Sequence, residues 1–339
     1  MNLAAVYPSR VRRQPAYGCT TSWATQVTRA PGSDAALTIR RSVSWGLGLW
    51  WAALLGLLVP WASASATLVR LNTSLGPVDI RLLDAEAPAT VANFLNYVNT
   101  GAYDANLIHR NVPGFVVQAG GYRWTGSAVS KIAQNPPVVN EFSPTRSNVC
   151  GTVAMAKVAG NPDSATSEWF VNMANNAANL DGQNGGFTVF GRVTAPGMAV
   201  MAQIAGLPVL ACSSPFGNLP VLTRPASCSV ANGTHFVLIQ NARVLPEPAT
   251  DADRVMTHLE AAYPQFLGAA SSTTGELAGY SYRYYATSNA YLAVKDGQLF
   301  YLGPAAGPAP VTLGAVSEWL AVADAQGYGP IAPTPACPR

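Results

Sequence analysis

Short apolar runs separated by clusters of glycine, proline and asparagine fill residues 67–245, and this spacing is what most limits how the chain can fold. The runs that we expect to form strands are 107–108, 115–118, 151–156, 168–172, 187–191 and 235–245. Many short strands at even spacing are typical of an antiparallel barrel or sandwich. Helices do not alternate regularly with these strands, which argues against a doubly wound fold.

Two further patterns complete this part of the chain. Residues 67–73 and 76–82 each alternate apolar and polar side chains, as a half-buried strand does, and the short break between them predicts a hairpin. Pro88 stands where a helix tolerates proline, in the first turn, and apolar residues follow it at helical spacing. We therefore expect a helix over 87–99 and a shorter one over 197–204.

The chain changes character after the stiff segment Pro246-Glu-Pro248. Thr250 and Asp253 have the spacing of a helix cap, and Lys295-Asp-Gly297 between apolar runs predicts a hairpin. We expect a linker at 246–249, a small α+β module over 250–331 ending in a helix at 316–325, and a loose tail at 332–339. The alternating tyrosines at 280, 282 and 284 fit a binding face or simple packing, and packing is the default.

Residues 1–66 have the pattern of a leader. Arg40 and Arg41 precede an uncharged stretch with an apolar core at about 43–61, and an Ala-x-Ala end follows at residues 62–66. This pattern is typical of a secretory signal peptide, with cleavage expected after Ala66 and export, most simply to a periplasm. The alternative is an uncleaved membrane anchor, because the apolar run is near the length of a membrane span. The 40 residues ahead of the apolar stretch are too long for the n-region of an ordinary signal peptide, and a misassigned start codon is the simplest explanation.

Charge and cysteine content exclude some classes of function. The net charge of +3 arises in the leader, which holds six arginines and one acid; residues 67–339 carry 14 basic and 16 acidic side chains. No basic patch suggests nucleic-acid binding, and no cysteine or histidine cluster has metal-ligand spacing. Export permits disulfides. Cys212 and Cys228 flank a turn-rich segment and are candidates, although four cysteines allow three pairings and Cys150 is equally consistent with a free buried thiol. The absence of a C-x-x-C motif argues against a redox protein.

The segment Ile108-His-Arg-Asn-Val-Pro-Gly-Phe-Val-Val-Gln-Ala-Gly-Gly121 resembles the cyclophilins, which are peptidyl-prolyl cis-trans isomerases. Four more motifs follow in the family's order, at 136–141, 151–156, 164–172 and 187–193, and they look like the bacterial periplasmic branch. The resemblance covers 67–245. It implies a closed eight-stranded antiparallel β-barrel capped by two helices, which acts on X–Pro bonds of polypeptides without a cofactor. We also expect a monomer with no stable membrane insertion after signal cleavage.

The resemblance also implies roles for individual residues. Arg110 matches the catalytic arginine, and Gln118 matches the glutamine that binds the substrate backbone and helps to hold that arginine. His109 matches a structural support. The positions that match the substrate-binding surface are Phe115, Val116, Ala156, Lys157, Glu168, Phe170, Leu180 and Phe187. Trp169 alternates with Phe170 along a strand, so we expect it in the core.

Several positions depart from the family pattern. Glu168 replaces a common glutamine, so a carboxylate near Arg110 either orients the guanidinium or partly neutralises it. Val116 replaces a longer methionine, and Phe187 replaces a histidine or tyrosine. Lys157 replaces an asparagine that usually contributes its backbone, and Asn179 replaces the tryptophan of animal members, which implies weak cyclosporin binding. The alternative function is a proline-segment binding module or scaffold with little catalytic activity.

Overall fold

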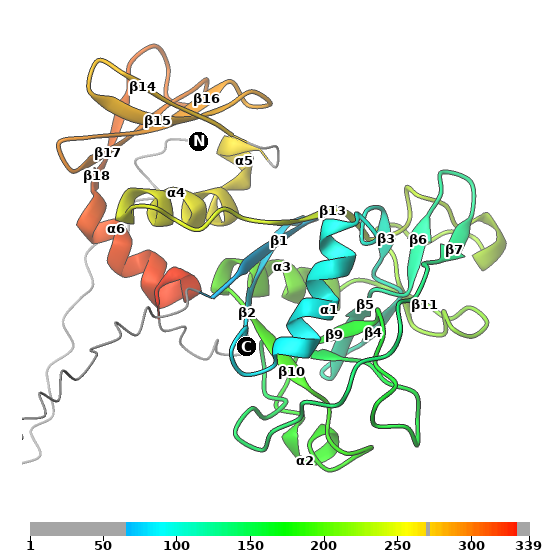
Figure 1. Ribbon diagram of the computed structural model, residues 1–339. Coiled ribbons are helices and arrows are strands. Elements are labelled where there is room, and N and C mark those ends of the chain that lie inside the picture. The colour runs from blue at the N-terminus through cyan, green and yellow to red at the C-terminus, as the bar shows by residue number, and fades with distance from the viewer. Residues whose placement is uncertain (1–65, 269–271, 331–339) are drawn as a thin grey trace, which may run out of the picture. The chain divides into compact units, whose positions relative to one another are not determined.

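The computed structural model describes residues 66–268 and 272–330, and its largest element is an eleven-stranded antiparallel sheet (Figure 1). The predicted leader and tail lie outside the described residues, apart from Ala66. The sheet has the order β4-β5-β9-β8-β10-β2-β1-β13-β3-β6-β7. Its strands are β1 (Leu68–Thr73), β2 (Gly76–Leu82), β3 (Asn106–Leu107), β4 (Arg110–Val112), β5 (Val116–Ala119), β6 (Tyr122–Trp124), β7 (Val129–Lys131), β8 (Thr152–Met155), β9 (Trp169–Asn172), β10 (Val189–Val193) and β13 (Leu238–Val244).

The strand order closes on itself. β3 and β4 stand near opposite ends of the order, yet only Ile108 and His109 separate them in the chain. The amide of Ile108 donates to the Val237 carbonyl at 3.0 Å, and that of His109 donates to the Gln118 carbonyl at 3.2 Å. The segment 106–112 is therefore one wall strand that pairs with β13 at its start and β5 at its end. Counting β3 with β4 and β5 with β6 gives a ring of eight, which confirms the predicted closed barrel.

Two helices cover the barrel, as predicted. α1 (Pro88–Asn99) begins with its proline in the first turn, and α3 (Ala195–Ala205) runs over the second expected segment (Figure 1). Inside one apolar core, Phe94 of α1 packs edge-on against Trp169 and at a tilt against Phe190. Shorter elements complete this part: α2 (Ala177–Leu180), β11 (Val209–Leu210), β12 (Leu219–Pro220) and η2 (Cys228–Val230). Over the described ranges, every helix is too short or too polar to cross a membrane.

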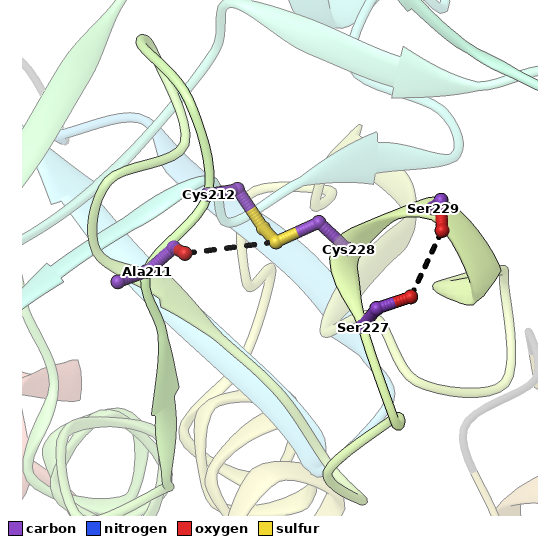
Figure 2. The surroundings of a disulfide bond; sticks show 5 residues. All are labelled: Ala211, Cys212, Ser227, Cys228 and Ser229. Atoms are coloured by element: carbon purple, nitrogen blue, oxygen red, sulfur yellow. Dashed lines mark hydrogen bonds between the residues drawn. A yellow bond between two sulfur atoms is a disulfide. The ribbon is translucent and has the colours of Figure 1, made fainter.

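A disulfide between Cys212 and Cys228 ties together the turn-rich segment beside the barrel (Figure 2). The two residues are 16 apart in sequence, and their Cα atoms lie 5.8 Å apart. Cys150 is buried and also disulfide-bonded, so it is not the free thiol that its sequence context left open. Disulfides of this kind are typical of proteins outside the reducing cytosol.

The residues after 249 form a second layered unit with its own core. α4 (Asp251–Ala262) starts with the predicted capping box, in which Thr250 and Asp253 exchange hydrogen bonds. One face of a five-stranded sheet packs against α4 through Tyr285, Leu292 and Leu299. The remaining elements are α5 (Pro264–Leu267), β14 (Thr273–Leu277), β15 (Tyr280–Tyr285), β16 (Ala290–Lys295), β17 (Gln298–Leu302), β18 (Val311–Ala315), α6 (Val316–Ala323) and η3 (Asp324–Tyr328).

The alternating tyrosines lie on the opposite face of this sheet from α4. Tyr282 and Tyr284 both contact the ring of Tyr291, with centroids 5.7 and 4.6 Å apart, and Tyr280 contacts Phe300 at 5.5 Å. Strand register places these rings on one side, because Tyr282 pairs with Ala293 and Tyr284 with Tyr291. Packing of aromatic rings against one another therefore accounts for much of the alternating tyrosine pattern.

A buried ionic cluster joins the barrel to the α4 unit. Arg70 points outward from β1 and is 3% exposed. Its guanidinium donates to both oxygens of Asp79 at 2.7 and 2.8 Å, and to Oε2 of Glu260 on α4 at 2.8 Å. Oε1 of Glu260 accepts from Arg283 at 3.0 Å and from the Tyr285 hydroxyl at 2.9 Å. A charge taken out of water needs such partners, so we expect the barrel and the α4 unit to depend on each other for stability.

Replacing Glu260 tests this dependence. Glu260→Gln removes the carboxylate shared by Arg70 and Arg283, and breaking one side of a buried ion pair costs about 3–5 kcal/mol. We expect the free energy of unfolding, measured by urea denaturation, to fall by about 3 kcal/mol or more on this basis. Glu276→Gln, at an exposed position of β14, is the control and leaves stability nearly unchanged. Equal free energies of unfolding for the two variants would contradict a stabilising role for Glu260.

His258 makes the stability depend on pH. This α4 residue is 1% exposed, and its ring packs against Tyr328 with centroids 5.3 Å apart. Burial lowers the pKa of His258 from 6.5 to about 4, in spite of the opposing charge of Asp79. Below pH 6.5, His258 therefore binds a proton in the unfolded chain but stays neutral in the folded chain. The free energy of unfolding declines as the pH falls, until the pH reaches about 4.

The size of this loss follows from the shift in pKa. At 1.36 kcal/mol per pH unit, the free energy of unfolding falls by about 3 kcal/mol between pH 6.5 and pH 4 through this one group. Chemical denaturation at several pH values measures it. His258→Phe keeps an aromatic ring and should flatten the slope over that range, whereas the control His235→Gln should preserve it. If the free energy of unfolding of His258→Phe depends on pH as steeply as that of the wild type, other groups cause the acid sensitivity.

Candidate active site

A row of side chains crosses four adjacent strands on the outer face of the barrel. Arg110 on β4 pairs with Gln118 on β5, and Gln118 pairs with Phe170 on β9. Phe170 in turn pairs with Ala154 on β8. Paired residues of antiparallel strands project to the same side, so the register alone places a cation, an amide and an aromatic ring side by side. Their chain neighbours Val117, Trp169 and Val171 project into the core.

The row borders a cavity of about 350 Å³ whose wall combines apolar and polar side chains. Val116, Ala154, Phe170, Leu180 and Val189 form a buried cluster of their own, separate from the main core. The rings of Phe170 and Phe187 meet edge to face, with centroids 5.8 Å apart. The residues that line the cavity are Arg110, Phe115, Val116, Gln118, Ala156, Lys157, Phe170, Asn179, Leu180, Gln183 and Phe187. This set includes every residue that the sequence analysis assigned to substrate binding or catalysis except Glu168.

Gln118 holds Arg110 at the edge of this cavity. Nη1 of Arg110 donates to Oε1 of Gln118 at 3.1 Å. Nε2 of Gln118 donates to Oε2 of Glu168 at 2.7 Å. Within the described ranges no carboxylate lies within ion-pair distance of Arg110, so its positive charge is directed to whatever occupies the cavity.

Glu168 therefore does not pair directly with Arg110, because Gln118 lies between the two side chains. Its carboxylate lies behind Gln118, 3.4 Å from Nε2 of the buried His109. Burial raises the pKa of Glu168, but the hydrogen bond and charge of His109, the hydrogen bond from Gln118 and the charge of Lys131 together lower it below the ordinary value of 4.5. The group is ionised at neutral pH. His109 contacts this carboxylate rather than the cavity.

Lys157 contributes its side chain in a way that the sequence analysis did not foresee. Its ammonium donates to the carbonyls of Asn184 and Gly186 at 2.8 and 2.6 Å, and it lies 4.9 Å from the centroid of the Phe187 ring. Burial lowers the pKa of Lys157. The lysine thus ties the loop at 184–186 to the cavity wall, and its charge is directed to these carbonyls.

Gln183 was missed, and Asn179 was noted only for cyclosporin, yet both line the cavity and hydrogen-bond to each other. They belong to α2 and the loop that follows it. Gly182-Gln-Asn-Gly-Gly186 signals a loop, but its path depends on two glycines with left-handed φ angles of 73° and 75°. No sequence pattern indicates which polar side chain of such a loop will line the cavity.

The cavity offers one fixed cation beside an apolar socket. Its titratable lining residues are Arg110 and Lys157, and the lysine is held by carbonyl groups. No group of three or more metal-ligating side chains occurs in the part of the chain that the structure describes. Such a site suits a reaction in which charge and shape are recognised and no covalent bond to the protein forms.

Comparisons with known proteins point to one family. Residues 68–223 match the family described as cyclophilin type peptidyl-prolyl cis-trans isomerase/CLD. The chain is 43% identical over 145 residues to peptidyl-prolyl cis-trans isomerase A of Dickeya dadantii, a match that covers 42% of this chain and 74% of that protein. It is 38% identical over 154 residues to a peptidyl-prolyl cis-trans isomerase of Acinetobacter baylyi, covering 45% of this chain and 79% of the relative.

A solved structure was also found. The crystal structure of a cyclophilin-type peptidyl-prolyl cis-trans isomerase from Cryptosporidium parvum, in the presence of the dipeptide Ala-Pro, covers 53% of this chain and 99% of its own. The TM-score is 0.40 and the sequence identity is 20%.

Proposed function

The chain belongs to the cyclophilin-type peptidyl-prolyl cis-trans isomerases, and from that membership we propose that Arg110 is the residue that accelerates rotation about X–Pro bonds. The amide resists rotation because the nitrogen lone pair is delocalised into the carbonyl, with a barrier of about 18–20 kcal/mol. In the twisted state the prolyl nitrogen regains its lone pair and accepts a hydrogen bond. A cation held at that nitrogen therefore binds the twisted state better than either planar isomer, which is what catalysis requires.

One observation carries this assignment: Arg110 lines a cavity beside a cluster of apolar side chains, and Gln118 anchors it through one nitrogen of its guanidinium. The other donors of the guanidinium remain available to the substrate, and arginine keeps its charge at any working pH. Gln118 supports the assignment through its position in the register between Arg110 and Phe170.

We propose that the proline ring occupies the socket made by Phe115, Val116, Phe170 and Leu180. A proline ring is apolar and rigid, so burying it against aromatic and aliphatic side chains is favourable. Ala156 lines the cavity, where its backbone can contact an extended chain, and Phe187 extends the wall beside Phe170. Rotation then requires only that the carbonyl side of the bond turns while the ring stays fixed.

We propose that the natural clients are exported proteins and that residues 67–245 carry the activity. The leader pattern at 1–66 and the disulfide between Cys212 and Cys228 support an oxidising location outside the cytosol. We place a linker at 246–249 and an accessory module at 250–331. The ion pairs of Arg70 favour a module that stays docked and stabilises the barrel. Proline-containing polypeptides would be the substrates, bound by one monomer.

Removing Arg110 tests the proposed catalysis. In a chain of residues 67–339, we expect Arg110→Ala to slow enzyme-catalysed exchange of an X–Pro peptide at least about tenfold, equivalent to ~1.4 kcal/mol of transition-state stabilisation. Exchange spectroscopy by NMR measures the rate. Arg123→Ala removes an exposed arginine of β6 and serves as the matched control. If the folded wild-type protein gives no acceleration, a proline-segment binding module replaces the enzyme as the function.

The proposed location is tested on the protein made in a bacterial host from the full sequence. We expect the mature chain in the periplasmic fraction, with Thr67 as its first residue by intact-mass measurement, because Ala66 ends the Ala-x-Ala pattern. Recovery in the membrane fraction with the leader still attached would support the retained anchor instead. A soluble cytoplasmic product with reduced cysteines would contradict export.

A further inference from the structure

Glu168 lies outside the cavity, yet it contacts the residue that anchors the catalytic cation. Gln118 separates it from Arg110: the amide nitrogen of Gln118 donates to Glu168 at 2.7 Å, and the amide oxygen accepts from Arg110 at 3.1 Å. We propose that Glu168 is a positioning residue, whose carboxylate fixes the orientation of the Gln118 amide and through it the guanidinium of Arg110. This inference rests on the proposed role of Arg110.

The chemistry of the three groups gives the chain of hydrogen bonds a direction. An ionised carboxylate only accepts hydrogen bonds, a guanidinium only donates them, and an amide does one at each end. With Glu168 on one side and Arg110 on the other, a single orientation of Gln118 satisfies both neighbours. The flipped amide would oppose oxygen to carboxylate and N–H to guanidinium. A glutamine at 168 both donates and accepts, so it imposes no such direction.

The position of the carboxylate is itself determined by its surroundings. His109 is 3% exposed, and its Nε2 lies 3.4 Å from Oε2 of Glu168. On the other side, Gly121 leaves the space that the carboxylate occupies. A methyl group at Gly121 would lie 2.6 Å from Oε1 and 2.9 Å from Cδ of Glu168. The φ angle of Gly121 is outside the left-handed range, so the backbone accepts alanine and the glycine is required only for this space.

Two substitutions therefore disturb the same contact from opposite sides. Glu168→Gln keeps the size of the side chain and removes its charge and its acceptor-only character. Gly121→Ala keeps Glu168, Gln118 and Arg110 and displaces the carboxylate. Gly217→Ala is the control for a glycine replacement, because its added methyl meets nothing closer than 3.9 Å and lies in the disulfide-linked loop.

We expect Glu168→Gln and Gly121→Ala each to lower kcat for X–Pro isomerisation about three- to tenfold, the effect of one hydrogen bond felt in the transition state, with KM nearly unchanged. The double variant should be no slower than the slower single one, because both changes remove one interaction. Gly217→Ala should match the wild type. The side-chain amide signals of Gln118 in NMR should shift in both variants and not in the control.

A pH titration separates positioning from general support of the fold. The groups that face Glu168 are His109, Lys131, Tyr103 and Tyr122, with Arg110 beyond Gln118. Because the pKa of Glu168 in the folded protein is lowered from its ordinary value of 4.5, its carboxylate is still mostly ionised at pH 4.5 and becomes protonated only at lower pH. Within the pH range where the protein remains folded, the wild-type Gln118 signals should move together with kcat below that pH. Glu168→Gln should show no such step.

The outcomes distinguish this inference from the proposed function. If Arg110→Ala is as active as the wild type, the proposed catalysis fails and the inference fails with it. If Arg110→Ala is slow while Glu168→Gln and Gly121→Ala keep wild-type kcat, Arg110 needs no positioning by Glu168 and the inference alone is overturned. Additive losses in the double variant, or losses that follow the folded fraction without any shift of the Gln118 signals, would also overturn it.

Discussion

Each residue in the wall of a closed barrel must face either the core or the exterior, and this two-sided constraint organises the whole molecule. The core side takes Val69, Leu71 and Trp169, with the ring of Phe94 from a capping helix among them. The outer side carries the polar chemistry at two separate places. Four strands present Arg110, Gln118 and Phe170 to a cavity, and β1 with β2 presents Arg70 and Asp79 to α4.

The two outer-face clusters differ in whether the charge of their arginine is neutralised. Arg70 is buried between Asp79 and Glu260, and their charges raise its pKa well above the ordinary value although burial opposes it. Its guanidinium divides its hydrogen bonds between Asp79 of the barrel and Glu260 and the Thr257 carbonyl of α4. Arg110 is anchored by a neutral amide, so its charge remains unneutralised at the cavity. A carboxylate in direct contact with Arg110 would weaken the field at the cavity, and the structure holds Glu168 behind Gln118.

Much of the fold followed from local patterns. The alternation in the first hairpin, the proline that opens α1, the capping box of α4 and the Asp-Gly turn all produced the expected elements. The cavity residues came from a family resemblance, since a lone arginine or phenylalanine has no pattern that distinguishes a site from ordinary packing. Contacts across the fold decide three further features: Glu168 binds Gln118, Lys157 binds the loop at 184–186, and Gln183 lines the cavity. No local sequence pattern encodes these contacts.

The sequence by itself determined which segments become strands and helices and which side of each strand is apolar, because period and turn chemistry are local properties. Motifs in the family's order also indicated most of the residues that line the cavity, although they did not indicate Gln183 and they wrongly included Glu168. Only the tertiary structure decided how the ring closes through the strand 106–112 and that Glu260 meets Arg70 across 190 positions of sequence. Charged contacts between distant segments depend on how surfaces come together in three dimensions, and the spacing of residues along one segment carries no record of that.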